Sequence, residues 1–205
     1  SANVAQLEAG RQVAVLREDG FEGVKKFLPP PSRRGVLLCD PSYELKTDYG
    51  RVIDMVSDAL QRFYALFSHD ALVMDKWFAL QAAAPEPLGE AAGATFTRIK
   101  TLLQHPDFNL RNPNRARSLL FGLCMQNPAG FHRLDAAGYV FWADRVLELD
   151  TANPSLAAKL ARALDRWRHL ASPWREAARE AIARVAAAPK LSADTREIVS
   201  RSLQE

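Results

Sequence analysis

The chain has 205 residues and a mass of 22.8 kDa, which is enough for one large domain or two small ones. Apolar residues make up 48% of it and charged residues 25%, as is ordinary for a soluble globular protein. Its longest apolar runs, residues 36–39 and 138–143, are far too short to cross a bilayer, and no secretion signal opens the chain. We therefore expect a cytoplasmic protein without a membrane partner.

Charge is spread evenly along the sequence. The first 63 residues carry nine basic and nine acidic residues, and the remainder carries eighteen and fifteen, so the net charge of +3 arises in the longer part. Because no run of like charges occurs, we do not expect RNA as a partner. The two cysteines, Cys39 and Cys124, are too few for a disulfide framework and are expected to be reduced, small apolar side chains.

The first sixty residues predict a β–α–β–α segment. Residues 13–16 form a short apolar run, and residues 21–28 then show helical spacing through Phe21, Val24 and Leu28. Three prolines stop that helix, because proline lacks the amide donor and clashes with the preceding turn. Residues 36–39 are apolar on both faces, as expected of a buried parallel strand, and a loop leads to a helix near residues 49–67.

Everything after about residue 63 reads as helix. One helix is expected to run from Leu156 to Leu170, with an apolar stripe that includes Trp167. Asn-Pro steps at residues 112, 127 and 153 separate the earlier helices. Short helices joined by short polar turns predict stacked α-hairpins. The predicted fold is therefore mainly α: a solenoid-like α-hairpin superhelix over residues 64–205, preceded by a short βαβα segment over residues 1–63.

The sequence holds little that could carry chemistry. Its four histidines are scattered, no His-Glu-x-x-His pattern occurs, and no glycine-rich phosphate loop is present, so we predict no metal site. One local pattern, Asp40-Pro41-Ser42-Tyr43, directly follows the second predicted strand, at the carboxyl end where α/β sheets bind ligands. A carboxylate there can accept a hydrogen bond from an exocyclic amine, and a tyrosine can stack on a flipped base. Ordinary turn chemistry explains the same residues, and the pattern alone leaves both open.

A series of motifs occurs in order before residue 62: Glu18-Asp19-Gly20-Phe21, Leu28-Pro29-Pro30, Ser32-Arg33-Arg34-Gly35, and Asp40-Pro41-Ser42-Tyr43-Glu44 followed by Lys46, Asp48 and Tyr49. Over residues 8–62 the chain thereby resembles the bacterial 23S rRNA adenine-N6 methyltransferase of the large subunit. The resemblance implies that Asp40 and the Pro41 carbonyl hold the target amine and that Tyr43 stacks on the adenine. It also implies that Asp19 and Gly20 contact S-adenosylmethionine. Because only two strands of the enzyme's sheet are represented, we expect no useful methyl transfer.

A second and longer set of motifs extends to the end of the chain. It comprises residues 67–78 (FSHDALVMDKWF), Asn112-Pro113-Asn114-Arg115 with Arg117-Ser118-Leu119, Asn127-Pro128-Ala129 with Phe131-His132, and Gly138-Tyr139. This part is similar to the C-terminal domain of bacterial aminopeptidase N, a zinc-dependent M1 metallopeptidase. The resemblance implies a helical superhelix that caps the catalytic domain and restricts peptide entry. It places Arg117 and Lys159 at cavity-facing, substrate-binding positions, although both are equally well explained as solvated helical charges.

The reading favoured by these observations is a non-catalytic helical module fused to an incomplete methyltransferase segment. The zinc and the S-adenosylmethionine belong to the two parent enzymes, and we expect no cofactor in this chain. Expected partners are the peptidase catalytic domain or a peptide substrate, together with self-association through uncovered strands. Two alternatives stay open. One is a methyltransferase remnant that still binds cofactor or RNA, and the other is a structural protein in which both segments have lost their original functions.

Overall fold

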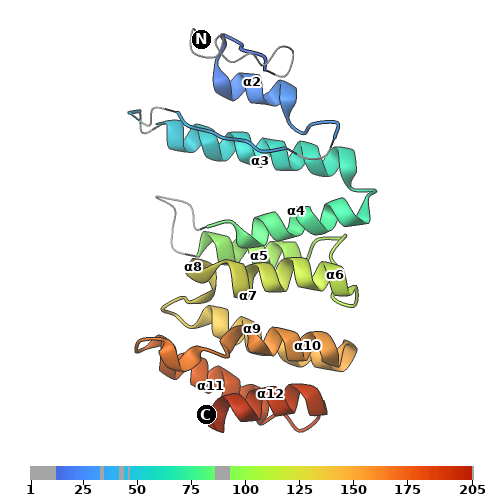
Figure 1. Cartoon of the computed structure of the whole chain (residues 1–205), viewed down its shortest axis with the longest axis vertical. Coiled ribbons are helices and arrows are strands. Elements are labelled where there is room, and N and C mark those ends of the chain that lie inside the picture. Colours follow the sequence, from blue (N-terminus) through green and yellow to red (C-terminus); the bar gives the residue numbers. More distant parts are fainter. Residues whose placement is uncertain (1–12, 33–34, 42–43, 46, 86–92, 205) are drawn as a thin grey trace. The chain divides into compact units, whose positions relative to one another are not determined.

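The computed structural model describes residues 13–32, 35–41, 44–45, 47–85 and 93–204. The chain divides into two compact units, Ser1–His69 and Asp70–Glu205. The division lies a few residues beyond the predicted boundary at residues 63 and 64, which falls inside a helix. Figure 1 shows the helices of both units. In the described part of the chain no helix is long and apolar enough to cross a membrane.

In the first unit, α2 (Gly20–Phe27) packs against α3 (Thr47–Phe67). Asp19 is the N-cap of α2, and its Oδ1 accepts hydrogen bonds from the amides of Phe21 and Glu22 at 2.8 and 3.4 Å. The helix ends at Phe27, and its C-cap Leu28 stands immediately before the prolines, as expected. Among the described residues of this unit, Met55 is the one large apolar side chain that is buried. The unit therefore has a very small core.

The predicted strands of this unit are not formed. Residues 13–16 and 36–39 are in no helix or strand, and their apolar side chains are largely exposed. A strand is stable only where a neighbour takes up its backbone hydrogen bonds, and a parallel strand also needs cover on both faces. The described residues supply neither. The predicted βαβα segment is therefore not seen in the residues that the structure describes.

The second unit is entirely helical where it is described, which confirms the mainly helical prediction. Its elements are α4 (Ala71–Ala83), α5 (Ala94–Leu103), α6 (Pro113–Ala116), a π-helical turn η2 (Arg117–Phe121), α7 (Gly122–Gln126), α8 (Pro128–Phe131), α9 (Ala137–Ala152), α10 (Pro154–Ala161), the 3-10 turns η3 (Arg162–Leu164) and η4 (Trp167–His169), α11 (Trp174–Ala186) and α12 (Ala193–Gln204). The single helix expected as far as Leu170 ends at Ala161 and continues as the two 3-10 turns.

Each Asn-Pro step separates two helices, as predicted, and also begins the second of them. Asn112, Asn127 and Asn153 are the N-caps of α6, α8 and α10, and each is followed by proline in the first helical turn. Asn127 is also buried and donates from Nδ2 to the carbonyl oxygens of Ala82 and Ala84 at 3.0 and 2.7 Å. It therefore caps one helix while satisfying the end of another.

The core of the second unit is centred on α9, which contacts both α10 and α11, and α12 packs on those two helices in turn. Trp142 of α9 is fully buried and donates from Nε1 to the Leu160 carbonyl at 2.9 Å. Asp150, near the end of α9, accepts hydrogen bonds from the Ser192 amide and from the hydroxyls of Ser192 and Thr195 at 2.5–2.7 Å. These contacts fix the start of α12 against α9.

Candidate functional site

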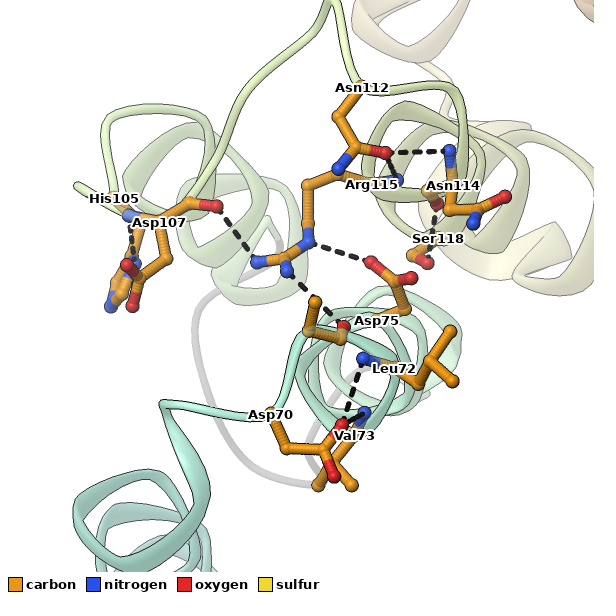
Figure 2. Close-up of polar contacts among 11 residues, drawn as sticks. Asp70, Leu72, Val73, Asp75, His105, Asp107, Asn112, Asn114, Arg115 and Ser118 are labelled. Carbon is orange, nitrogen blue, oxygen red and sulfur yellow. Dashed lines mark hydrogen bonds and ion pairs between the residues drawn. The ribbon is translucent and has the colours of Figure 1, made fainter.

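The start of α4 and the start of α6 are held together by one buried side chain. Arg115 donates from Nε to Asp75 Oδ1 at 2.8 Å, from Nη1 to the Asp107 carbonyl at 2.8 Å and from Nη2 to the Ala71 carbonyl at 3.4 Å. Figure 2 shows this guanidinium between the residues of α4 and the loop that carries Asp107. Its central carbon also lies 4.9 Å from the centre of the Phe78 ring. These contacts fix the position of α6 relative to α4.

Local capping sets the same two helix starts. Asp70 accepts hydrogen bonds from the amides of Leu72 and Val73 at 3.1 and 3.2 Å, and Asn112 accepts from those of Asn114 and Arg115 at 3.0 and 3.3 Å. Both caps are drawn in Figure 2. Because these side chains satisfy amides that a helix leaves unpaired, each helix begins at a defined residue.

A groove of about 540 Å³, which we term the α4 groove, runs between α4 and the helical segment 113–126. It is lined by Leu72, Asp75, Lys76, Ala79, Asn114, Arg117, Ser118, Phe121, Gly122, Met125 and Gln126. At Gly122 the two helices approach so closely that an added Cβ would lie 2.7 Å from the Cβ of Ala82. The π-helical turn η2 falls in the middle of the groove wall, and such turns are frequent at functional sites.

The α4 groove presents two cations above an apolar lining. Arg117 and Lys76 are both exposed, and in the described part of the chain neither has an ion pair. Arg117 lies over the Phe121 ring at 5.9 Å from its centre. The carboxylate of Asp75 faces the groove but is already bonded to Arg115. The groove can therefore accept a ligand that combines a carboxylate with apolar surface.

Lys159 lies elsewhere. It lines a second groove of about 450 Å³ between α10 and α12, together with Ser155, Ala158, Arg162, Asp194, Glu197, Ile198 and Arg201. Lys159 is exposed, and it faces a wall of α12 that carries both acidic residues and Arg201. Arg117 and Lys76 thus line the same groove, whereas Lys159 lines the other one. The sequence analysis did not single out Lys76.

In the first unit, Asp19 is occupied by contacts within its own unit. Besides capping α2 through Oδ1, it accepts a hydrogen bond on Oδ2 from Arg51 Nη2 at 2.7 Å. This bond lowers the pKa of the Asp19 carboxyl, and the Arg51 guanidinium lies 4.0 Å from the centre of the Phe21 ring. Gly20 opens α2, and no atom lies within 4 Å of the position where a Cβ would stand. Sequence reasoning missed Arg51, which stands 32 residues after Asp19.

Of the other candidate residues in the methyltransferase-like motif, the structure describes Asp40 and Pro41. Asp40 is exposed and Pro41 is partly buried, and both lie in extended chain rather than at the end of a strand. Tyr43 lies outside the described residues. Among the described residues no group of three or more histidine, cysteine or acidic side chains could hold a metal ion. The donor set for a zinc site is therefore not found there.

The stacked helices of the second unit and the cationic groove between them define a helical-repeat module. Residues 49–204 match the family described as a domain of unknown function (DUF3458_C) with ARM repeats. Since this match covers most of the chain, the chain belongs to that family.

Named relatives support this assignment. Aminopeptidase N of Caulobacter vibrioides is 39% identical over 145 residues, and aminopeptidase N of Escherichia coli is 36% identical over 147 residues; both alignments cover 71% of this chain. The crystal structure of Legionella pneumophila aminopeptidase A in complex with aspartic acid superposes with a TM-score of 0.66 at 28% identity, over 74% of this chain and 17% of that one. The chain spans only 16% of the length of each of these two aminopeptidase N relatives.

The first part matches a different group of proteins. Residues 4–75 match the family described as ribosomal RNA large subunit methyltransferase D, RlmJ. Ribosomal RNA large subunit methyltransferase J of Escherichia coli is 40% identical over 67 residues, which are 31% of this chain and 24% of that protein. Both resemblances drawn from the sequence motifs are thus confirmed, and the two matched regions overlap along α3 and the start of α4.

Proposed function

We propose that the chain acts as the non-catalytic helical cover of an M1-type aminopeptidase. It associates with a peptidase catalytic domain, and its second unit restricts which peptides reach the active site. The zinc chemistry belongs to that catalytic domain. The presence of only two cysteines, too few for a disulfide framework, fits a cytoplasmic setting.

The observation that carries this proposal is the α4 groove. Two exposed cations, Arg117 and Lys76, stand beside apolar side chains on helices whose starts are fixed by Arg115 and by two N-caps. A peptide offers a carboxylate and apolar side chains, so it matches both parts of the lining. Lys159 offers a second, weaker contact from the groove between α10 and α12, because an ammonium cannot form two parallel hydrogen bonds to a carboxylate.

Reconstitution tests the proposal. The chain is mixed with an aminopeptidase N catalytic domain that lacks its own C-terminal part, and association and peptide hydrolysis are measured. We expect a complex that cleaves short peptides faster, relative to long ones, than the catalytic domain alone does. Absence of a complex at tens of micromolar would overturn the proposal, since a cover must bind what it covers.

Single substitutions then test the groove within that complex. Arg117→Ala should raise the KM for peptides with a free C-terminal carboxylate but leave the KM for the corresponding amides unchanged. Lys159→Ala should do the same to a smaller extent. Arg179→Ala is the matched control, because Arg179 is an exposed arginine of α11 outside both grooves. Equal effects of Arg117→Ala and Arg179→Ala would remove Arg117 from the peptide site.

A second candidate function is favoured by the match of residues 4–75: residual binding of S-adenosylmethionine by Asp19 and Gly20, with Asp40, Pro41 and Tyr43 facing an adenine. Calorimetry of the chain with S-adenosylmethionine tests it. Asp19→Asn is the informative variant, because asparagine retains the N-cap while the charge is removed. Binding that is lost in this variant favours the candidate, and no heat at millimolar ligand refutes it.

A further inference from the structure

Residues 35–39 of the first unit form a largely exposed, mostly apolar segment. The side chains of Val36 and Leu38 are 98% and 91% exposed, whereas that of Leu37 is 43% exposed and that of Cys39 is also partly covered. This alternation is that of an extended strand with one face turned to solvent. In the described part of the chain, the backbone of residues 36–39 makes no hydrogen bond.

An extended segment of this kind is a template for strand pairing. Its amides and carbonyls are free to pair, and the four residues Val36-Leu37-Leu38-Cys39 include no charge, no proline and no glycine. Proteins that keep such edges unpaired usually protect them with charged residues or bulges, and neither interrupts this one. The segment therefore needs another strand.

We propose that this strand comes from a second copy of the chain, in antiparallel pairing about a two-fold axis at Leu37. Leu37 then faces Leu37 of the other copy, and Val36 faces Leu38. In this register an even-numbered residue always faces an even-numbered residue and an odd-numbered one faces an odd-numbered one. Because alternate side chains of a strand lie on the same face, Val36 and Leu38 of both copies then lie on one face of the pair. The exposed pair of one copy consequently contacts the exposed pair of the other.

Charge favours a second copy over an unrelated partner. In the sequence two arginines precede Gly35, and Asp40 follows Cys39. Antiparallel pairing of two copies therefore brings the basic end of one segment beside the acidic end of the other, once at each end of the pairing. Opposite charges that face each other across strands stabilise the pair. The first 63 residues also carry equal numbers of basic and acidic residues, so two copies do not repel.

Cross-linking tests the register. The variant Leu37→Cys, made together with Cys39→Ser, places one thiol opposite its own copy, and facing residues of paired strands lie within disulfide reach. Mild oxidation should convert it to a covalent dimer. The control is Leu134→Cys with Cys39→Ser, because Leu134 is 73% exposed in the second unit. Cys124 is buried and stays in place. Cross-linking of both variants at the same rate, or of neither, would overturn the register.

The mass in solution tests the association itself. Sedimentation of the unmodified chain should show conversion from 22.8 kDa to twice that mass as concentration rises. Val36→Lys with Leu38→Lys should leave only monomer, and these changes cannot unfold the unit because both side chains already lie in water. Leu134→Lys should dimerise as before. A chain that stays monomeric at hundreds of micromolar, or a dimer that survives the double lysine variant, would refute the proposal. The outcome is independent of peptidase binding, which involves the second unit.

Discussion

Asp75 and Arg115 form an ion pair across α4 and α6, with 2.8 Å between Oδ1 and Nε and with both side chains largely buried. The arginine also donates to two carbonyls, so most of its donors are satisfied without water. The pair lies directly beside the α4 groove, which Asp75 helps to line. The shape of the groove therefore depends on this ion pair.

Breaking this pair should destabilise the second unit strongly. Arg115→Ala leaves the Asp75 carboxylate, the Asp107 carbonyl and the Ala71 carbonyl without their donor. Removing one partner of a buried ion pair typically costs about 3–5 kcal/mol. We expect a loss of this size in the free energy of unfolding, measured by urea titration.

The double variant Arg115→Met with Asp75→Leu is the control, because it removes both charges and fills the space with apolar atoms. It should lose clearly less stability than Arg115→Ala. Arg117→Ala should change stability by less than about 0.5 kcal/mol, since that side chain is exposed. If Arg117→Ala destabilised the unit as much as Arg115→Ala, the assigned role of the buried pair would be wrong.

The contrast between these two arginines shows what the sequence could not provide. Asn114-Arg115-Ala116-Arg117 places two arginines one residue apart, and nothing local tells which is buried. Two residues span about 200° of a helix, so one points inward and the other outward, and the choice depends on α4. Lys76 was missed for the same reason, because its relation to Arg117 arises only from the packing of two helices.

Features that depend on neighbours in sequence were predicted well. The Asn-Pro steps at residues 112, 127 and 153 were correctly predicted to separate helices, because asparagine before proline is a local signal, and the structure adds that each asparagine is an N-cap. The strands at residues 13–16 and 36–39 were predicted from an equally clear local pattern, yet a strand needs a partner that the pattern does not contain. The helix expected as far as Leu170 failed differently: its apolar stripe persists through Leu164 and Trp167, but 3-10 turns replace the α-helix.

Asp150→Ala should loosen α12 from α9. The carboxylate accepts three hydrogen bonds from Ser192 and Thr195, and hydrogen bonds to charged groups contribute about 1.5–3 kcal/mol each, although not additively. We expect a loss of about 3 kcal/mol in the free energy of unfolding and faster amide exchange in the first turn of α12. The control is Asp144→Ala, because the Asp144 carboxylate is also on α9 but is only half-buried and pairs with Arg184 of α11 rather than with α12. Unchanged exchange in α12 would argue against this role.

Gly138→Ala should be poorly tolerated. A Cβ at this position would lie 2.0 Å from the carbonyl oxygen of Phe131, so the backbone of α8 or α9 would have to move. Forcing atoms into a packed interior typically costs about 1–3 kcal/mol, and backbone displacement places this case at the upper end. Thermal unfolding measures the effect. Val140→Ala, at an exposed position of the same helix, should have little effect, and a Gly138→Ala variant as stable as the parent would contradict the close packing.

The second unit should lose stability in mild acid through His132. The Nδ1 of His132 lies 2.8 Å from the hydroxyl of the fully buried Tyr139, and the Phe131 ring lies beside the imidazole. Burial raises the pKa of Tyr139 to about 12, so its hydroxyl keeps its proton, and it donates to Nδ1 when the neutral imidazole carries its own proton on Nε2. Burial also lowers the pKa of His132, because it disfavours the charged ring.

Because the folded-state pKa of His132 lies below its unfolded value, the unfolded chain binds the proton more readily and stability rises with pH. The contribution is complete above the unfolded value of about 6.5 and is lost as pH falls through the folded-state pKa. Urea midpoints measured from pH 7.5 to pH 5 should therefore decrease, and His132→Gln should flatten this dependence. His169→Gln is the control, since His169 is exposed, and it should retain the slope. If the slope were the same in the His132→Gln variant, another group would be responsible for the acid sensitivity.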